Sequence, residues 1–344
     1  MKQEIIIINN EKCKKKDSLF YCENLEMKSL PESLNKKFDI HLILRESQIN
    51  NTHKIELKNI NISSNIFGFL FNIFKTFKKN KAIYLVISVT PYTFISFFLL
   101  FLFRKKIFLY LRSDGKKEIK IVFGKILSYF YRLAEFLMSK YSELIVVNDR
   151  ILKNKKYNLV SPSQINEIWT KGTSYPDLSR IKLLYVGRIK IEKGVNSLAG
   201  LFNRIKSNNS MSLSLVGNGK GDDYSNESIN FLGPISKKEI LIKQYDEHNI
   251  FVLPSFTEGH PQVLIESLTR KRPVIIFDEI KHVKKNYKGV FVCNRNSEDF
   301  LATIKYIIKN YKEIFHSMNY NNIPTQKEFI LQLERIFLPT VSKS

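Results

Sequence analysis

Short runs of aliphatic and β-branched residues alternate with longer amphipathic segments along most of this chain. This alternation constrains the fold most strongly, because strand, helix and strand in succession form parallel βαβ units with a buried sheet. The pattern stops at residues 166–180, where Gly172 and Pro176 lie among small polar residues, and then restarts. We therefore predict an α/β fold: two Rossmann-like doubly wound domains in tandem, with an interdomain cleft for a ligand.

Hydrophobic periodicity places the individual elements. Strands are expected in the first domain at 4–8, 39–45, 82–89, 106–112 and 143–148, and a long helix at 120–141. In the second domain we expect strands at 181–186, 211–217, 229–233, 250–254, 273–277 and 290–293, and helices at 194–205, 237–247, 261–271 and 298–311. Thr325 and Glu328 form a capping box that opens a last helix. The predicted organisation is a first domain at 1–165, a linker at 166–180, a second domain at 181–318 and a C-terminal segment at 319–344.

Residues 82–103 carry no charge over a length that could span a bilayer. Pro91 argues against one continuous span, because a proline inside a helix removes a hydrogen bond and breaks the pattern. The residues before it are β-branched and strand-like, and those after it form a short helix that ends at the basic residues 104–106. We predict a βαβ unit here rather than a transmembrane helix.

The net charge of +23 is concentrated in one part of the chain. Residues 51–156 contain 20 Lys and Arg against 6 Asp and Glu, interleaved with aromatic and aliphatic runs. Such a field attracts polyanions or an anionic membrane surface. The segment 65–81 has two interpretations: an interfacial helix on anionic lipid, or a helix that packs its phenylalanines into a core and places its lysines at the negative end of its dipole.

Three cysteines, Cys13, Cys22 and Cys293, have no metal-ligand spacing and cannot all pair with one another. The four-isoleucine run near the N-terminus is too short for the apolar core of a signal peptide. We expect a cytoplasmic protein, on the inner face of the membrane if the basic region binds lipid.

The chemistry concentrates in the second half. Gly187 follows an expected strand, and Arg188 and Lys193 follow it closely. A glycine lets the backbone approach a ligand, while a guanidinium fork and an ammonium together suit a diphosphate. The alternative for both cations is an ordinary solvated surface role.

Two carboxylates, Glu258 and Glu266, are separated by seven residues around an expected helix start at Pro261. The free amides of Gln262 and Val263 would face a ligand at that helix N-terminus. Ionised carboxylates accept hydrogen bonds, which suits sugar hydroxyls. The alternative for each glutamate is a surface acid that caps or favours the helix dipole.

The segments "LLYVGRIKIEKGV", "SLVGNGKG", "INFLGPI", "NIFVLPSFTEGHPQVLIESL" and "RPVII" together resemble, in order and spacing, the C-terminal domain of retaining GT-B glycosyltransferases of the family-four type. The carboxylate pair is similar to the E-x7-E motif of that family. The resemblance covers residues 181–276 well and 277–318 loosely, and it implies a last helix that returns to the first domain.

The resemblance implies a role for each matching position. Arg188 and Lys193 match residues that bind the donor diphosphate and stabilise it as a leaving group. Glu258 and the Gly259, His260 and Pro261 backbone match the part that faces the transferred sugar, and Glu266 matches the residue that binds the ribose. The Gly233-Pro234-Ile235 turn lies where the family holds the base; retention and the absence of a required metal or other cofactor are also implied.

Three departures from the family pattern stand out. Lys271 occupies the position of a usual glycine, and the glycine-rich loop that commonly follows "PVI" is replaced by "FDEIKHVKKNYKG". The N-terminal glycine-rich loop is absent too, so the acceptor side maps poorly. Asp114, at an expected strand end, is a candidate acceptor-side acid or base, although an Asp-Gly turn explains it as well.

The function that these features predict is transfer of a sugar, with a hexose expected, from a nucleoside-diphosphate donor to a lipid-linked or cell-surface glycan, at an anionic membrane surface. A nucleotide-sugar epimerase of the same fold is an alternative. A basic nucleic-acid-binding protein is another, but we expect no nucleic-acid partner, because the charge lies among apolar runs rather than stacking platforms. The base, sugar, linkage, acceptor and oligomeric state stay open.

Overall fold

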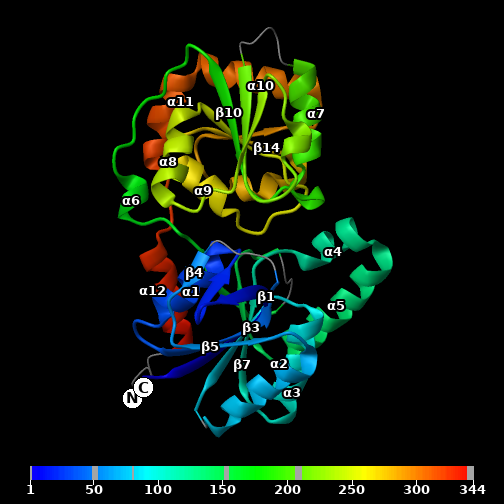
Figure 1. Cartoon of the computed structure of the whole chain (residues 1–344). Coiled ribbons are helices and arrows are strands. Elements are labelled where there is room, and N and C mark those ends of the chain that lie inside the picture. Colours follow the sequence, from blue (N-terminus) through cyan, green and yellow to red (C-terminus); the bar gives the residue numbers. More distant parts are fainter. Residues whose placement is uncertain (1, 49–52, 80, 151–154, 206–210, 339–344) are drawn as a thin grey trace. The chain divides into compact units, whose positions relative to one another are not determined.

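The computed structural model describes residues 2–48, 53–79, 81–150, 155–205 and 211–338. The chain divides into two compact units, which Figure 1 shows in full. Unit 1 comprises residues 1–164 and 327–344, and unit 2 comprises residues 165–326.

Unit 1 is built on a predominantly parallel sheet. Its strands are β1 (Glu4–Lys16), β2 (Leu19–Cys22), β3 (Asp39–Glu46), β4 (His53–Ile55), β5 (Asn59–Ser63), β6 (Ile83–Ile87), β7 (Lys106–Leu111), β8 (Glu143–Val146) and β9 (Asn158–Leu159). Its helices are α1 (Leu25–Leu34), α2 (Ile66–Lys75), α3 (Pro91–Leu102), α4 (Gly115–Phe123), α5 (Lys125–Lys140) and α12 (Gln326–Phe337), with a 3-10 turn at Thr76–Lys78. The parallel strands follow the order β5-β3-β1-β6-β7-β8-β9, and β2 and β4 extend the second half of β1 in antiparallel fashion.

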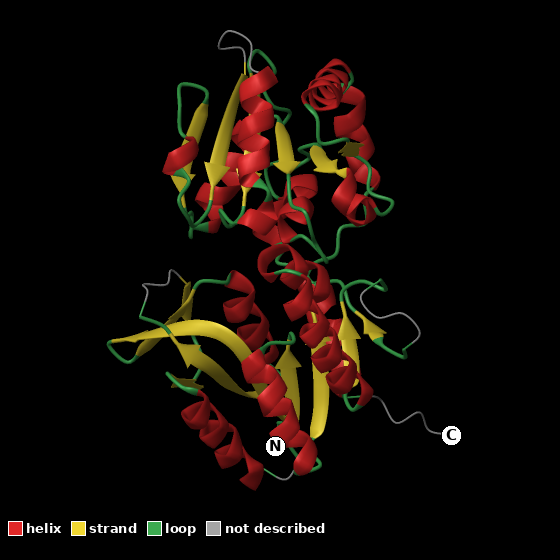
Figure 2. Cartoon of the chain, turned by 90° about the vertical axis from the view of Figure 1, so that its right-hand side faces the viewer, coloured by secondary structure: helices red, strands yellow, loops and turns green. Residues whose placement is uncertain are grey.

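Alternation along β1 divides the core of unit 1 into two layers. Ile5 and Ile7 pack with the buried faces of α1 and α12 on one side of the sheet. Ile6 and Ile8 pack with α2, α3 and α5 on the other side. Figure 2, turned by 90° from Figure 1, shows helices in front of the strands of this unit. The isoleucine run is therefore a strand that is buried on both faces, as parallel strands covered by helices require.

Unit 2 is a six-stranded parallel sheet in the order β12-β11-β10-β13-β14-β15. Its strands are β10 (Ile181–Val186), β11 (Met211–Val216), β12 (Ile229–Gly233), β13 (Ile250–Leu253), β14 (Val274–Phe277) and β15 (Val290–Cys293). Its helices are α6 (Glu167–Thr170), α7 (Val195–Ile205), α8 (Lys238–Glu247), α9 (Gln262–Thr269), α10 (Ser297–Lys309) and α11 (Tyr311–Ser317). Short 3-10 turns lie at Ile191–Lys193, Asp222–Tyr224, Asp278–Lys284 and Met318–Tyr320. In chain order this sheet reads 3-2-1-4-5-6, the Rossmann arrangement, so the predicted fold class is confirmed.

The prediction of one long helix at 120–141 is wrong in one respect. Gly124, with a φ of 87°, separates α4 from α5. The apolar periodicity continues on both sides of this glycine, which conceals the turn from a periodicity argument.

The uncharged stretch at 82–103 folds as strand β6 followed by helix α3. Thr90 and Thr93 form a capping box in which each hydroxyl accepts the backbone N–H of the other residue. Pro91 occupies the first helical position, where its missing N–H costs nothing. None of the helices in the described part of the chain has the length and apolar character that crossing a membrane requires.

The segment that was predicted as a linker contributes to unit 2. It contains the one-turn helix α6, and the Trp169 indole is 1% exposed against the core of that unit. At the other end of unit 2, helix α12 buries Phe329, Leu333 and Phe337 in the core of unit 1.

Candidate functional site

The predicted donor residues lie at the topological switch point of unit 2. Strands β10 and β13 are adjacent and parallel, and the chain leaves them toward β11 and β14 respectively, on opposite sides. Ligands of doubly wound sheets bind outside the carboxyl ends of the strands at this point. The segment 187–193 follows β10 and the segment 254–258 follows β13, so residues far apart in sequence meet here.

Glycines allow the backbone segments at this edge to approach one another closely. A Cβ at Gly194 (φ 69°) would lie 2.1 Å from the carbonyl oxygen of Pro254. A Cβ at Gly217 would lie 1.7 Å from the carbonyl oxygen of Gly187. The Phe256 N–H donates to the carbonyl of Glu192 and joins the two segments directly. No larger residue fits either glycine position without moving the backbone around the site.

Lys193 and Glu258 form the central ion pair of the site. The Lys193 Nζ lies 2.6 Å from Oε1 of Glu258, and the Ser255 hydroxyl donates to the same oxygen at 2.7 Å. The Glu258 side chain is 10% exposed and that of Lys193 is 22% exposed. A charge-assisted bond in this partly desolvated position is stronger than a surface ion pair.

Arg188 lies beside this pair and reaches further into solvent. Its side chain is 46% exposed, and its Nη2 is 3.9 Å from Oε1 of the buried Glu192. Tyr185 donates its hydroxyl to the Arg188 carbonyl at 2.7 Å. Burial and the nearby Glu258 carboxylate raise the pKa of Tyr185, whereas Arg188 opposes that rise. The structure thus brings Arg188 and Glu258 near one buried tyrosine, and Lys193 pairs with that glutamate.

Glu266 occupies a different and more enclosed environment. It is 6% exposed on α9, and the Tyr245 hydroxyl of α8 donates to its Oε2 at 2.9 Å. Burial raises the pKa of Glu266 to about 7, although the hydrogen bond from Tyr245 opposes this rise. The charge of Lys238 also lowers this pKa, but burial has the larger effect and favours the neutral form of the carboxyl.

The loop from β13 to α9 carries the remaining predicted contacts. Gly259 and Pro261 are buried, and His260 is half-buried between them. Helix α9 begins at Gln262, one residue later than predicted, with Pro261 as its N-cap. Val263 and Ile235 are partly buried against the unit 2 core, while Pro234 is exposed just after β12. The roles assigned to these residues stay predictions.

Three residues of this site were not predicted from the sequence. Ser255 donates to Glu258, and Glu192 lies beside Arg188 and accepts the Phe256 N–H, as described above. The third, His282, belongs to the loop that departs from the family pattern, and its Nε2 donates to the Glu258 carbonyl at 2.8 Å. A histidine in a short 3-10 segment gives no periodic signal, so tertiary contact alone reveals it.

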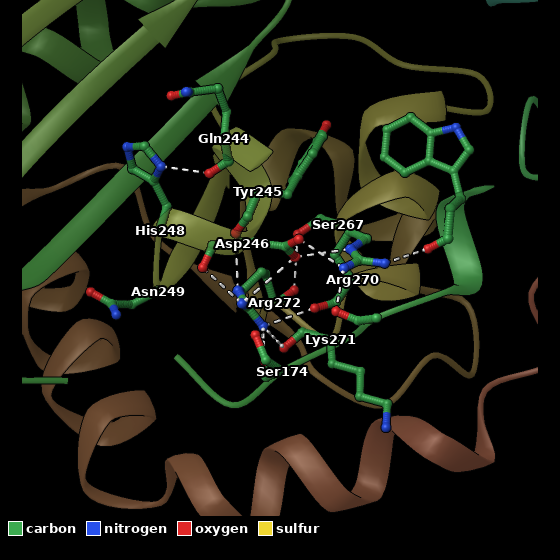
Figure 3. A network of polar contacts seen from close by, with 12 residues as sticks. Ser174, Gln244, Tyr245, Asp246, His248, Asn249, Ser267, Arg270, Lys271 and Arg272 are labelled. Carbon is green, nitrogen blue, oxygen red and sulfur yellow. Dashed lines mark hydrogen bonds and ion pairs between the residues drawn. The ribbon is translucent and has the colours of Figure 1, made fainter. Parts of the chain in front are cut away.

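Arg270 and Arg272 belong to a separate polar network (Figure 3). Both are 1% exposed, and Arg270 binds Asp246 through Nε at 2.9 Å and Nη2 at 2.7 Å. The two guanidiniums also donate to backbone carbonyls of the segment before β10; the acceptors are Trp169, Lys171, Gly172 and Ser174. This network anchors the 169–174 segment to unit 2 and explains why the arginines are not available to a ligand.

Asp114 is the N-cap of α4. Its carboxylate accepts the Lys117 N–H at 3.2 Å, and the Lys117 ammonium lies 3.9 Å away. This arrangement accounts for the residue through helix capping. Its predicted acceptor-side role stays a prediction.

One group in the described part of the chain has metal-ligand spacing. The ligand atoms of Glu4, Asp39 and His41 lie within 4.8 Å of one another. The Lys79 ammonium contacts both Glu4 and His41 and already supplies a positive charge there. These residues lie at the amino ends of β1 and β3, the edge opposite to where doubly wound sheets bind ligands.

Known proteins resemble this chain in sequence and in fold. Residues 180–310 match the family described as Glycosyl transferases group 1. An uncharacterized glycosyltransferase of Haemophilus influenzae is 25% identical over 172 residues, which cover 46% of this chain and 48% of that protein. An uncharacterized glycosyltransferase of Methanocaldococcus jannaschii is 22% identical over 197 residues, which cover 48% and 50%. This chain therefore spans about half the length of the curated relatives that it matches.

Solved structures share the fold over the whole chain. Sucrose-phosphate synthase from Thermosynechococcus elongatus has a TM-score of 0.71 at 15% identity, with 100% of both chains covered. HepE of Anabaena in complex with UDP has a TM-score of 0.66 at 12% identity, again with 100% of both covered. WaaG, a glycosyltransferase involved in lipopolysaccharide biosynthesis, has a TM-score of 0.63 at 11% identity, with 97% and 99% covered. The resemblance to GT-B glycosyltransferases is confirmed, and the fold is theirs.

Proposed function

We propose that this chain is a glycosyltransferase that moves a sugar from a nucleoside-diphosphate donor to a glycan acceptor. The observation that carries the proposal is the Lys193–Glu258 pair at the switch point of unit 2, inside the segment that matches the group 1 family. Lys193 is a cation suited to bind phosphate, and Glu258 is a carboxylate suited to accept sugar hydroxyls; the two lie side by side there.

In this proposal Lys193 and Arg188 bind the two phosphates of the donor. The bond between the sugar C1 and the diphosphate oxygen breaks while the acceptor oxygen bonds to C1, and the acceptor proton leaves with the diphosphate. The cations stabilise the charge that develops on the leaving group, an effect that often dominates catalysis. Attack on the face from which the diphosphate departs retains the configuration at C1, and no metal ion takes part.

Glu258 and Glu266 would contact different parts of the donor. Glu258, held by Ser255 and Lys193, faces the transferred sugar. Glu266 would accept a ribose hydroxyl near the N-terminal half of α9, in place of or beside its bond with Tyr245. Support for a uridine nucleotide comes from HepE, which was solved with UDP and with UDP-glucose.

The acceptor is proposed to be a lipid-linked or cell-surface glycan. Support comes from the basic and apolar sequence of unit 1 and from the fold shared with WaaG. The place of action would be the cytoplasmic face of a membrane.

The test is to incubate the purified full chain with a panel of UDP-, GDP- and ADP-sugars, with and without lipid-linked glycan acceptors, and to follow release of the nucleoside diphosphate. We expect acceptor-dependent release with one donor, and thermal stabilisation by the same nucleoside diphosphate. Lys193→Ala should lose both, while the exposed Lys305→Ala on α10 keeps both. Isomerisation of the donor sugar without transfer would instead identify an epimerase.

A further inference from the structure

Four helices of unit 1 expose large apolar side chains on their outer surfaces. We call these outward-facing side chains of α2, α3, α4 and α5 the α2–α5 face. Phe67 on α2 is 81% exposed, Leu102 on α3 is 65% exposed, and Ile126 and Phe130 on α5 are 74% and 63% exposed. Isolated exposed apolar residues are ordinary, but so many on adjacent helices mark an interaction site.

The α2–α5 face is continuous from helix to helix. The Phe74 ring of α2 lies 5.8 Å from that of Phe103 at the end of α3, centroid to centroid. The Phe101 ring of α3 lies 4.8 Å from that of Tyr141, which follows α5. These rings are themselves about half exposed, so they join the surfaces of neighbouring helices into one apolar area.

Helices α4 and α5 form a hairpin that carries many of the exposed apolar side chains of this face. The Tyr131 ring packs directly over Gly115, where a Cβ would lie 2.1 Å from its hydroxyl oxygen. Ser128 donates its hydroxyl to the Lys116 carbonyl at 3.1 Å. These contacts between α4 and α5 hold the hairpin together, while Ile126 and Phe130 stay exposed to solvent.

Basic residues surround and interleave the α2–α5 face. Residues 65–141 contain 14 Lys and Arg and 3 Asp and Glu. The Lys75 ammonium lies 4.4 Å from the centroid of the Phe71 ring, and that of Lys140 lies 5.2 Å from the centroid of Tyr141. Lysines next to exposed aromatic rings can reach anionic headgroups while the rings enter the apolar boundary.

The three acidic residues of this region are engaged locally. Asp114 caps α4, and Glu118 accepts from the Ser113 hydroxyl at 3.3 Å. Glu135 is half-buried on α5, and burial and the nearby Asp114 raise its pKa to about 7. A second copy of this chain would therefore bring one strongly positive face against another, which opposes a symmetric dimer.

We propose that the α2–α5 face docks this protein on an anionic lipid bilayer, with the apolar side chains of the α4–α5 hairpin inserted at the headgroup boundary. The exposed apolar area and the positive charge of this face together fit an anionic bilayer. A nucleic acid would neutralise the lysines and arginines but would leave the exposed aromatic rings in contact with water. The proposal extends the proposed function, on which it rests for one point: a lipid-linked acceptor would lie in the same bilayer.

Vesicle sedimentation with the purified full chain tests this proposal without any sugar transfer, so its outcome is separate from that of the transfer assay. We expect binding to phosphatidylcholine vesicles that contain phosphatidylglycerol, little binding to pure phosphatidylcholine, and partial release at high salt. The double variant Ile126→Asp/Phe130→Asp should lose binding by about tenfold or more. The matched control, Ile240→Asp/Tyr320→Asp, alters two exposed apolar residues of unit 2 and should bind like the unaltered chain.

Charge reversal provides an independent arm. Lys120→Glu/Lys125→Glu changes two exposed lysines of the same hairpin and should weaken binding to anionic vesicles by about tenfold or more at low salt. Circular dichroism and thermal unfolding should be unchanged in all of these variants, since every substituted side chain is exposed. The proposal is overturned if the unaltered chain stays in the supernatant at low salt, or if the hairpin variants bind normally. It is equally overturned if the variants instead convert a dimer to a monomer in analytical ultracentrifugation.

Discussion

The Lys193 ammonium and the Glu258 carboxylate neutralise each other across the carboxyl ends of β10 and β13, with Nζ 2.6 Å from Oε1. Each side chain is thereby held in place before any ligand arrives. A donor diphosphate would compete with Glu258 for Lys193. Phosphate binding by Lys193 would therefore affect the position of Glu258, the carboxylate that is proposed to face the sugar. The two roles can be separated by substitution.

Replacing Glu258 by glutamine should have opposite effects on diphosphate binding and on transfer. The amide keeps the shape but removes the anion that competes for Lys193, so a nucleoside diphosphate alone should bind as tightly or up to about tenfold more tightly. Transfer should fall by about a hundredfold or more, because the group that is proposed to face the sugar is altered. Titration calorimetry and initial rates measure the two effects; weaker diphosphate binding would contradict this arrangement.

His282 acts as a positioning residue in our interpretation. Its hydrogen bond to the Glu258 carbonyl holds the backbone of the loop that is proposed to face the transferred sugar. We expect His282→Ala to lower kcat by about tenfold, the value of one hydrogen bond, with a smaller change in the KM for the donor. Lys281→Ala, which removes a surface pair with Asp278, is the matched control and should leave both constants unchanged. An effect on thermal stability equal to that on kcat would indicate a structural role instead.

Glu266 should make stability depend on pH. Its pKa is raised from 4.5 to about 7, so the folded chain holds this proton more tightly than the unfolded chain between those values. The free energy of unfolding therefore falls as the pH rises through this interval, and the loss is complete above about pH 7.

The Glu266→Gln variant lacks this titration. Relative to the unaltered chain, it should gain about 2 to 3 kcal/mol of stability between pH 5 and pH 8. Urea unfolding at the two pH values measures the difference. Glu239→Gln, at an exposed position of α8, should show no such gain. If the free energy of unfolding depends on pH equally in the unaltered chain and in both variants, then the pKa of Glu266 in the folded chain is close to its ordinary value.

Asp246 should be among the most sensitive structural positions of unit 2. Its removal leaves Arg270 and Arg272, both fully buried, without their carboxylate. Breaking a buried charge network in this way costs about 3 to 5 kcal/mol. We expect that loss for Asp246→Ala in chemical denaturation, against a change within about 0.5 kcal/mol for the exposed Asp223→Ala.

The central strands of both sheets were predictable because they are buried on both faces and bounded by turn residues. Gly187 and Arg188 could be placed at a strand end on this basis alone. Strands β2, β4, β5 and β9 were not predicted, because they are short and partly exposed and give no continuous apolar run. The contact of Lys193 with Glu258 could not be derived from residue spacing, since it depends on β13 pairing with β10 rather than with β12. The burial of Glu266 against Tyr245 likewise depends on how α8 and α9 face each other, which periodicity within either helix does not determine.

Lys271 shows how a departure in sequence can preserve a backbone. It stands where the family usually has glycine, and its φ is 53°, in the left-handed region that glycine favours after a helix. Its ammonium lies 5.0 Å from the centroid of the Phe315 ring. Lys271 therefore adopts, directly after α9, the left-handed conformation that glycine favours at this position.

The placement of α12 has a consequence for biosynthesis. Phe337 packs its ring edge-on against Phe38 and Phe108, at centroid distances of 6.0 and 5.2 Å, so the core of unit 1 is completed by residues that are translated after all of unit 2. Domains generally fold in the order in which they leave the ribosome. The core of unit 1 cannot be completed until α12 has been synthesised, which is after the whole of unit 2. The part of the chain that is translated first is therefore the last to finish folding.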